Sequence, residues 1–129
     1  MKLVSAFLLV TVVSATSVCS EVVLRGIPSQ RIEVVGSSVS SNSLPTADAI
    51  AATVAIDRQG DRYFWSSRNG IELVRRVSGI YTIFIAQSGA GYIKVERPLY
   101  DGEPFHFLEH VHLGLGTITY FGETQAFKD

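Results

Sequence analysis

The chain has one cysteine, four prolines and no excess of either charge. Because Cys19 is alone, no disulfide can form within the chain, so a buried core must hold the fold together. Lys and Arg together number 11 and Asp and Glu number 12, which leaves no net field to attract nucleic acid or an anionic membrane. The sequence therefore excludes a disulfide-stapled scaffold and argues against nucleic acid as a partner.

Long apolar runs are also missing. The longest covers residues 3–13, well short of the ~20 residues that a membrane-spanning helix needs, so no transmembrane span is expected. This run follows Lys2 and precedes small polar residues, which is the pattern of a secretory signal peptide. We therefore expect residues 1–20 to be a signal peptide, cleaved after Ala15 or Ser20, and the protein to be periplasmic or secreted. The alternative is a buried N-terminal strand or helix.

Residues 21–129 read as a single β-rich domain. The Ser-rich segment 36–43 is expected to be a flexible loop, and the alanine-rich segment 46–51 a short helical turn. The Asn69–Gly70 pair suits a turn with positive φ angles. Short strands are expected where β-branched and aromatic residues gather between turn signals, over 22–24, 32–35, 53–57, 62–67, 72–77, 80–86 and 92–96.

The C-terminal segment has two interpretations. Alternation with a period of two favours one strand over 111–121, and a short helix over 104–110 is an alternative for the residues before it. Together with the preceding strands, this predicts an all-β fold: a single-domain antiparallel sandwich or small barrel of about seven short strands, with at most one or two short helical turns.

All three histidines lie within seven residues, beside Glu109. His106 to His110 matches H-x-x-E-H, an inverted zinc-protease motif, but the short chain that follows offers few further ligands. A simpler metal site would use His106, Glu109, His110 and His112. On a strand, however, His110 and His112 share one face and Glu109 lies on the other. We therefore favour no metal and no cofactor, with zinc as the candidate if one binds.

The segment from Arg62 to Arg68 combines aromatic and basic residues. On a strand, Tyr63 and Trp65 face one side and Arg62, Phe64 and Arg68 the other. We favour Trp65 and Tyr63 as core residues, because aromatic side chains bury large areas. The functional alternative is a binding face in which Arg62, Tyr63, Trp65 and Arg68 contact a ligand by stacking and hydrogen bonding.

These features favour a small exported, non-enzymatic β domain that binds a small ligand or a protein partner through a sheet face or rim. Phosphate-loop and serine-nucleophile motifs are absent from the sequence. Two alternatives remain open. One is a metal-dependent enzyme built on the histidine cluster. The other is a structural subunit whose exposed sheet edge pairs with another subunit to form a homo-oligomer.

Overall fold

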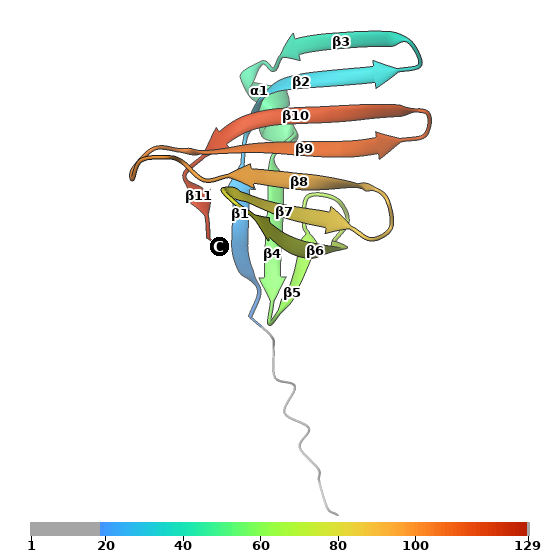
Figure 1. Ribbon diagram of the computed structural model, residues 1–129. Helices are drawn as coiled ribbons and strands as arrows, with labels where there is room; N and C mark the ends of the chain where they lie inside the picture. Colours follow the sequence, from blue (N-terminus) through green and yellow to red (C-terminus); the bar gives the residue numbers. More distant parts are fainter. Residues whose placement is uncertain (1–18, 129) are drawn as a thin grey trace, which may run out of the picture.

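The computed structural model of the protein describes residues 19–128 (Figure 1). Of the predicted signal peptide, only Cys19 and Ser20 fall within this range, and residues 1–18 lie outside it. Across the described range, no helix combines the length and the apolar character that crossing a membrane requires.

The described chain forms one curled antiparallel sheet and one short helix, which confirms the all-β prediction. The expected strand number was wrong, because residues 19–128 form eleven strands and not about seven, and the sheet is a half-barrel and neither the sandwich nor the closed small barrel that the sequence predicted. In chain order the elements are β1 (Glu21–Gly26), β2 (Pro28–Val35), β3 (Ser38–Ser43), α1 (Thr46–Ala51), β4 (Val54–Gln59), β5 (Arg62–Trp65), β6 (Ile71–Ser78), β7 (Tyr81–Ala86), β8 (Gly91–Glu96), β9 (Phe105–Leu113), β10 (Gly116–Thr124) and β11 (Ala126–Phe127).

The strand order explains the curl. Across the sheet the order is β11-β1-β4-β5-β6-β7-β8-β9-β10-β2-β3, so β1 and β2 lie near opposite ends. In the sequence, however, only Ile27 separates these two strands, and only Gln125 separates β10 from β11. Such short links require the two ends of the sheet to approach each other. In Figure 1, β1 and β4 accordingly run across the direction of β9 and β10.

The corner where the ends meet is packed around Phe107 of β9. A Cβ atom on Gly26 of β1 would lie 2.4 Å from the Phe107 ring, and one on Gly122 of β10 would lie 2.8 Å from it. Glycine is therefore needed at both positions for the ring to fit. Beside it, the hydroxyl of Thr124 donates a hydrogen bond of 2.6 Å to the carbonyl of Arg25, which joins β10 to β1.

The single strand expected over 111–121 was wrong, as was the alternative helix over 104–110. β9 and β10 form a hairpin in which Leu113 pairs with Gly116, and the turn residue Gly114 has a φ of 58°. A two-residue turn puts the residues on either side of it on the same face, which shifts the alternation by one position. The apolar and polar residues before and after the turn happen to follow one continuous period-two pattern. The sequence pattern therefore gives no sign of the turn.

The Ser-rich segment also differs from expectation, because residues 38–43 form β3 instead of a flexible loop. This strand lies at an edge of the sheet and is exposed throughout. It forms by backbone pairing with β2 and does not bury an apolar face. Two other predictions are confirmed. Helix α1 covers residues 46–51, and Asn69 and Gly70 both have positive φ angles, 56° and 68°.

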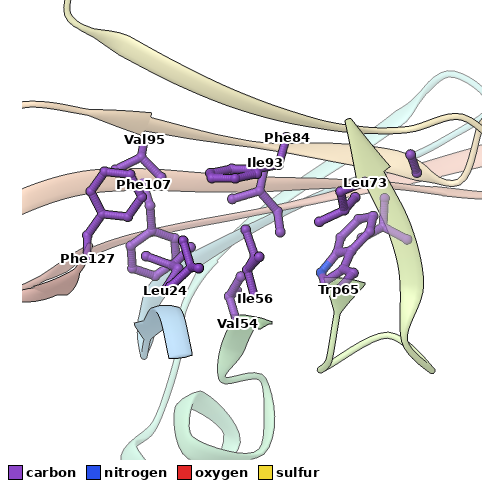
Figure 2. Packing of buried hydrophobic residues seen from close by; sticks show 13 residues of the cluster. Leu24, Val54, Ile56, Trp65, Leu73, Phe84, Ile93, Val95, Phe107 and Phe127 are labelled. Carbon is purple, nitrogen blue, oxygen red and sulfur yellow. The ribbon is translucent and has the colours of Figure 1, made fainter. Parts of the chain in front are cut away.

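The core lies on the inner face of the curled sheet. It draws side chains from β11, β1, β4, β5 and β6 on one side and from β7, β8 and β9 on the other (Figure 2). The buried hydrophobic cluster comprises Val23, Leu24, Val54, Ile56, Trp65, Leu73, Phe84, Ala86, Ile93, Val95, Phe107, Val111 and Phe127. None of these residues belongs to β10, β2 or β3, so the inner face of those strands extends beyond the core.

Candidate functional site

One row of paired residues crosses the inner face from polar to apolar surroundings. From β2 to β7 the partners are Arg31, Tyr120, Glu109, Ile93 and Phe84. Directly paired residues on adjacent antiparallel strands point to the same face. Ile93 and Phe84 are fully buried in the core, whereas Arg31 and Tyr120 are only partly buried. Glu109 therefore marks the boundary between the core and the uncovered part of the inner face.

The carboxylate of Glu109 is 1% exposed and accepts two hydrogen bonds. The indole Nε1 of Trp65 donates to its Oε2 over 2.7 Å, and Nη2 of Arg68 donates to its Oε1 over the same distance. A buried carboxylate is costly unless it is paired and hydrogen-bonded, and both conditions are met here. The three side chains form a single unit that fixes the position of the Arg68 guanidinium.

Arg68 enters from the loop over residues 66–70, between β5 and β6. This loop is fixed against β4 by Ser67, whose backbone N–H donates to the carbonyl of Ala55. The Ser67 hydroxyl in turn accepts a hydrogen bond of 3.0 Å from the Ala55 N–H. The positive φ angles of Asn69 and Gly70 then allow the chain to return into β6. The Asn-Gly signal in the sequence thus contributes to placing an arginine on the inner face.

The Arg68 guanidinium keeps its charge. Partial burial lowers its pKa, but the hydrogen bond and the charge of Glu109 act in the opposite direction, so the pKa of Arg68 lies above its ordinary value. Its guanidinium carbon also lies 5.9 Å from the ring centre of Tyr120, within the range of a cation–π contact. One edge of the cation is thus held by Glu109 while about a third of the side chain is exposed.

An open hollow of about 310 Å³ lies beside Arg68. Its floor comes from the inner face of β2 and β10, and its walls from the loop after β5 and from the segment around α1. Polar groups dominate the lining, with two arginines, one acid and three hydroxyl groups. We call it the arginine hollow; it is lined by Arg31, Leu44, Asp48, Ala51, Ala52, Thr53, Ser67, Arg68 and Tyr120.

Arg31 is the second cation of the arginine hollow. Its Nη2 donates to Oε2 of Glu33 over 2.7 Å, an ion pair that is about one-third exposed. Its Nε is buried and has no hydrogen-bond partner among the described residues. Buried donors without a partner are uncommon in folded proteins. The hydrogen bonds around the arginine hollow thus leave this donor unsatisfied.

The predicted ligand-binding residues do not come together. Arg62 is paired with Glu72 on the exposed part of β5 and β6, and Tyr63 packs on Phe84 with ring centres 5.4 Å apart. Trp65 is fully buried, as the core interpretation expects. Of the four, only Arg68 lines the arginine hollow. Sequence reasoning missed Arg31 and Tyr120, which reach the site from strands far away in the sequence, where no local pattern marks them.

The predicted metal ligands are divided between the two faces of β9. Glu109 points inward, whereas His106, His110 and His112 alternate with it and lie on the outer face. No group of three or more His, Cys, Asp or Glu residues with metal-site geometry is found within residues 19–128. Among the four predicted ligands, His110 and His112 are in direct contact, with ring centres 5.0 Å apart.

His110 belongs to a small polar cluster on the outer face. Its Nδ1 lies 2.8 Å from the hydroxyl of Thr119, and its ring stacks on Tyr92 with ring centres 5.1 Å apart. Burial lowers the pKa of His110 below its ordinary value, and the charge of nearby His112 lowers it further. His106 lies apart, with Nδ1 at 3.7 Å from a carboxylate oxygen of Glu123.

Comparison with protein-family models, curated proteins and solved structures found no match to this chain.

Proposed function

We propose that the protein is a binding module that takes a small organic carboxylate into the arginine hollow. The observation that carries this proposal is the orientation of Arg68 by the buried Glu109, which leaves part of a fixed guanidinium facing an open polar hollow. A guanidinium offers several N–H donors in one plane, and this arrangement matches a carboxylate. Because the cation is already positioned, binding costs little additional side-chain ordering.

The other lining groups narrow the ligand class. Asp48 and the hydroxyls of Thr53, Ser67 and Tyr120 border the same hollow. An acid in the wall disfavours a bare anion but accepts hydrogen bonds from a hydroxyl or ammonium group. The best fit is therefore a carboxylate that also carries such a donor, as in a hydroxy acid or an amino acid. A volume of about 310 Å³ lies at the lower end for ligand pockets, which favours a small molecule.

Binding is favoured over catalysis because the buried carboxylate is already committed. Both oxygens of Glu109 accept strong hydrogen bonds, one from Trp65 and one from Arg68. A general base must lie within reach of its substrate, whereas the Glu109 carboxylate is 1% exposed and faces Trp65 and Arg68. Together with the export expected from residues 1–20, the proposal describes a small exported protein that binds a polar metabolite.

The test is a titration of the purified protein with propionate, lactate and alanine, followed by NMR and calorimetry. These probes share a carboxylate, and the last two add a hydroxyl or an ammonium group. We expect lactate or alanine to bind more tightly than propionate. Arg68→Lys should weaken binding at least about tenfold, because lysine cannot reproduce the planar contact. Arg62→Lys is the matched control and should change nothing, since Arg62 is paired with Glu72 away from the hollow.

The Asp48→Asn variant tests whether the hydroxyl or ammonium group of the ligand contributes to binding. It should reduce the preference for alanine over propionate while leaving propionate binding intact or stronger. The proposal is wrong if none of the three probes binds at millimolar concentration, or if Arg68→Lys and Arg62→Lys have equal effects.

A further inference from the structure

The two edges of the sheet are built differently. One edge is β11, which has two residues and is followed by Lys128. The other is β3, which has six residues, Ser38–Ser43, all exposed, and which within residues 19–128 pairs with β2 alone. Natural edge strands are usually shortened, bulged, or protected by charge or proline against pairing with another chain. β3 has no charge and no proline, and its register with β2 has no bulge.

The unpaired backbone groups of β3 can be assigned. Val35 pairs with Ser38 across a two-residue turn, which makes this a hydrogen-bonded pair. Hydrogen-bonded and non-hydrogen-bonded pairs then alternate along the ladder. The N–H donated by Leu44 to the carbonyl of Ser29 fits the same alternation. It follows that the N–H and C=O groups of Val39, Ser41 and Ser43 point away from β2, toward open space.

We propose that β3 pairs antiparallel with β3 of a second copy of this chain, about a twofold axis at Ser41. In this register the two Ser41 residues form a hydrogen-bonded pair, and Val39 pairs with Ser43 of the second copy on each side. Every outward N–H and C=O of the three residues then finds a partner. Twofold pairing of identical surfaces is the commonest way in which soluble proteins form oligomers.

The side chains favour a second copy over a different protein. Foreign strands are selected by pockets or charges beside the edge, and the small neutral side chains of β3 offer neither. Against its own copy, β3 places Ser40 opposite Asn42 on the inner face, with no like charges in contact. The same register puts Arg31 of β2 in one row with Glu33 of the second copy, because these residues pair with Asn42 and Ser40. Beyond the neutral pair of β3 residues, each row therefore has opposite charges at its two ends, one from each copy.

Sedimentation velocity across a concentration series tests the pairing. The purified protein and Ser41→Ala should both show a reversible dimer. Ser41→Pro removes the outward N–H at the axis without removing a hydrogen bond to β2, and Ser41→Lys places two positive charges opposite each other. Each should raise the dimer dissociation constant at least about tenfold. Their circular dichroism should match that of Ser41→Ala; if proline disturbs the hairpin, the lysine variant decides.

A cysteine at the axis tests the register. In a Cys19→Ser background, Ser41→Cys should form an intermolecular disulfide under mild oxidation, because hydrogen-bonded partners have Cα atoms about 5.5 Å apart. Ser38→Cys is the matched control and should not, since the proposed register separates the two copies of residue 38 by about 20 Å. A protein that stays monomeric at high concentration, or a dimer that Ser41→Lys leaves intact, overturns the proposal. So would equal cross-linking of the two cysteine variants.

Discussion

The indole of Trp65 and the carboxylate of Glu109 form one buried unit, joined by a hydrogen bond of 2.7 Å from Nε1 to Oε2. The two residues lie on β5 and β9, which are separated by three strands in the sheet. The bond therefore crosses the interior of the half-barrel. It ties together the two sides of the curl, and it positions the carboxylate that holds Arg68.

Trp65→Ala is expected to destabilise the protein by about 3–5 kcal/mol, because it leaves a large cavity and an unpaired carboxylate oxygen. Chemical denaturation followed by circular dichroism measures the change. Tyr100→Ala is the control, since Tyr100 is 71% exposed and should alter stability by less than about 0.5 kcal/mol. A melting temperature lowered by only a degree or two in Trp65→Ala would contradict its place in the core.

Glu109→Gln keeps the size of the side chain but removes its charge. The amide oxygen can accept from Trp65 or from Arg68 but not from both, so we expect a loss of about 1.5–3 kcal/mol. Ligand binding in the arginine hollow should weaken as well, because Arg68 loses its fixed position. The control Glu72→Gln removes an exposed carboxylate that pairs with Arg62 and should have a much smaller effect.

His110 gives the stability a pH dependence of known sign. An unfolded chain protonates imidazole near pH ~6.5, whereas the folded pKa is lower. As pH falls through this interval the unfolded state takes up the proton first, so stability decreases, and it levels off below the folded pKa. The melting temperature should therefore decrease as the pH is lowered from 8 to 5. This decrease should be smaller in His110→Gln. An NMR titration placing the pKa of His110 above 6.5 would refute the prediction.

The outer-face histidines should not hold zinc tightly. His110 and His112 supply two ligands at most, and Glu109 is on the opposite face of the strand. Protein zinc sites use three or four ligands converging at about 2.0–2.3 Å. Calorimetric titration with zinc at neutral pH should detect only weak binding. Stoichiometric sub-micromolar binding that disappears in His110→Ala would instead support a metal-dependent function.

The export prediction rests on the sequence alone. Intact-mass analysis of protein recovered from the cells that make it should give an N-terminus between Thr16 and Val22, because the apolar segment is followed by small residues suited to signal peptidase. A mass that retains Met1 would contradict it.

The strands from β4 to β8 could be predicted because each is short, rich in β-branched and aromatic residues, and bounded by glycine turns. The β9–β10 hairpin could not, because its two-residue turn imitates a continued alternation. β3 escaped prediction because a strand exposed on both faces carries no hydrophobic pattern. For the candidate site, the segment around Arg68 was recognisable. Its partners were not recognisable as such, because the sheet pairing brings them together: Glu109 was predicted only as a metal ligand, and Tyr120 and Arg31 were not predicted as site residues at all.

The position of β2 beside β10 affects how the chain folds. β2 joins the main sheet through β10, so Val35 must find Gly116 across most of the length of the protein. Pairings of such high contact order form slowly, because the entropy of closing a long loop is lost before any contact stabilises the pair. While the last strands are still being synthesised, β2 and β3 have nothing to dock on. Completion of the sheet is thus a late event in folding, because β2 and β3 join it only after β10 has formed.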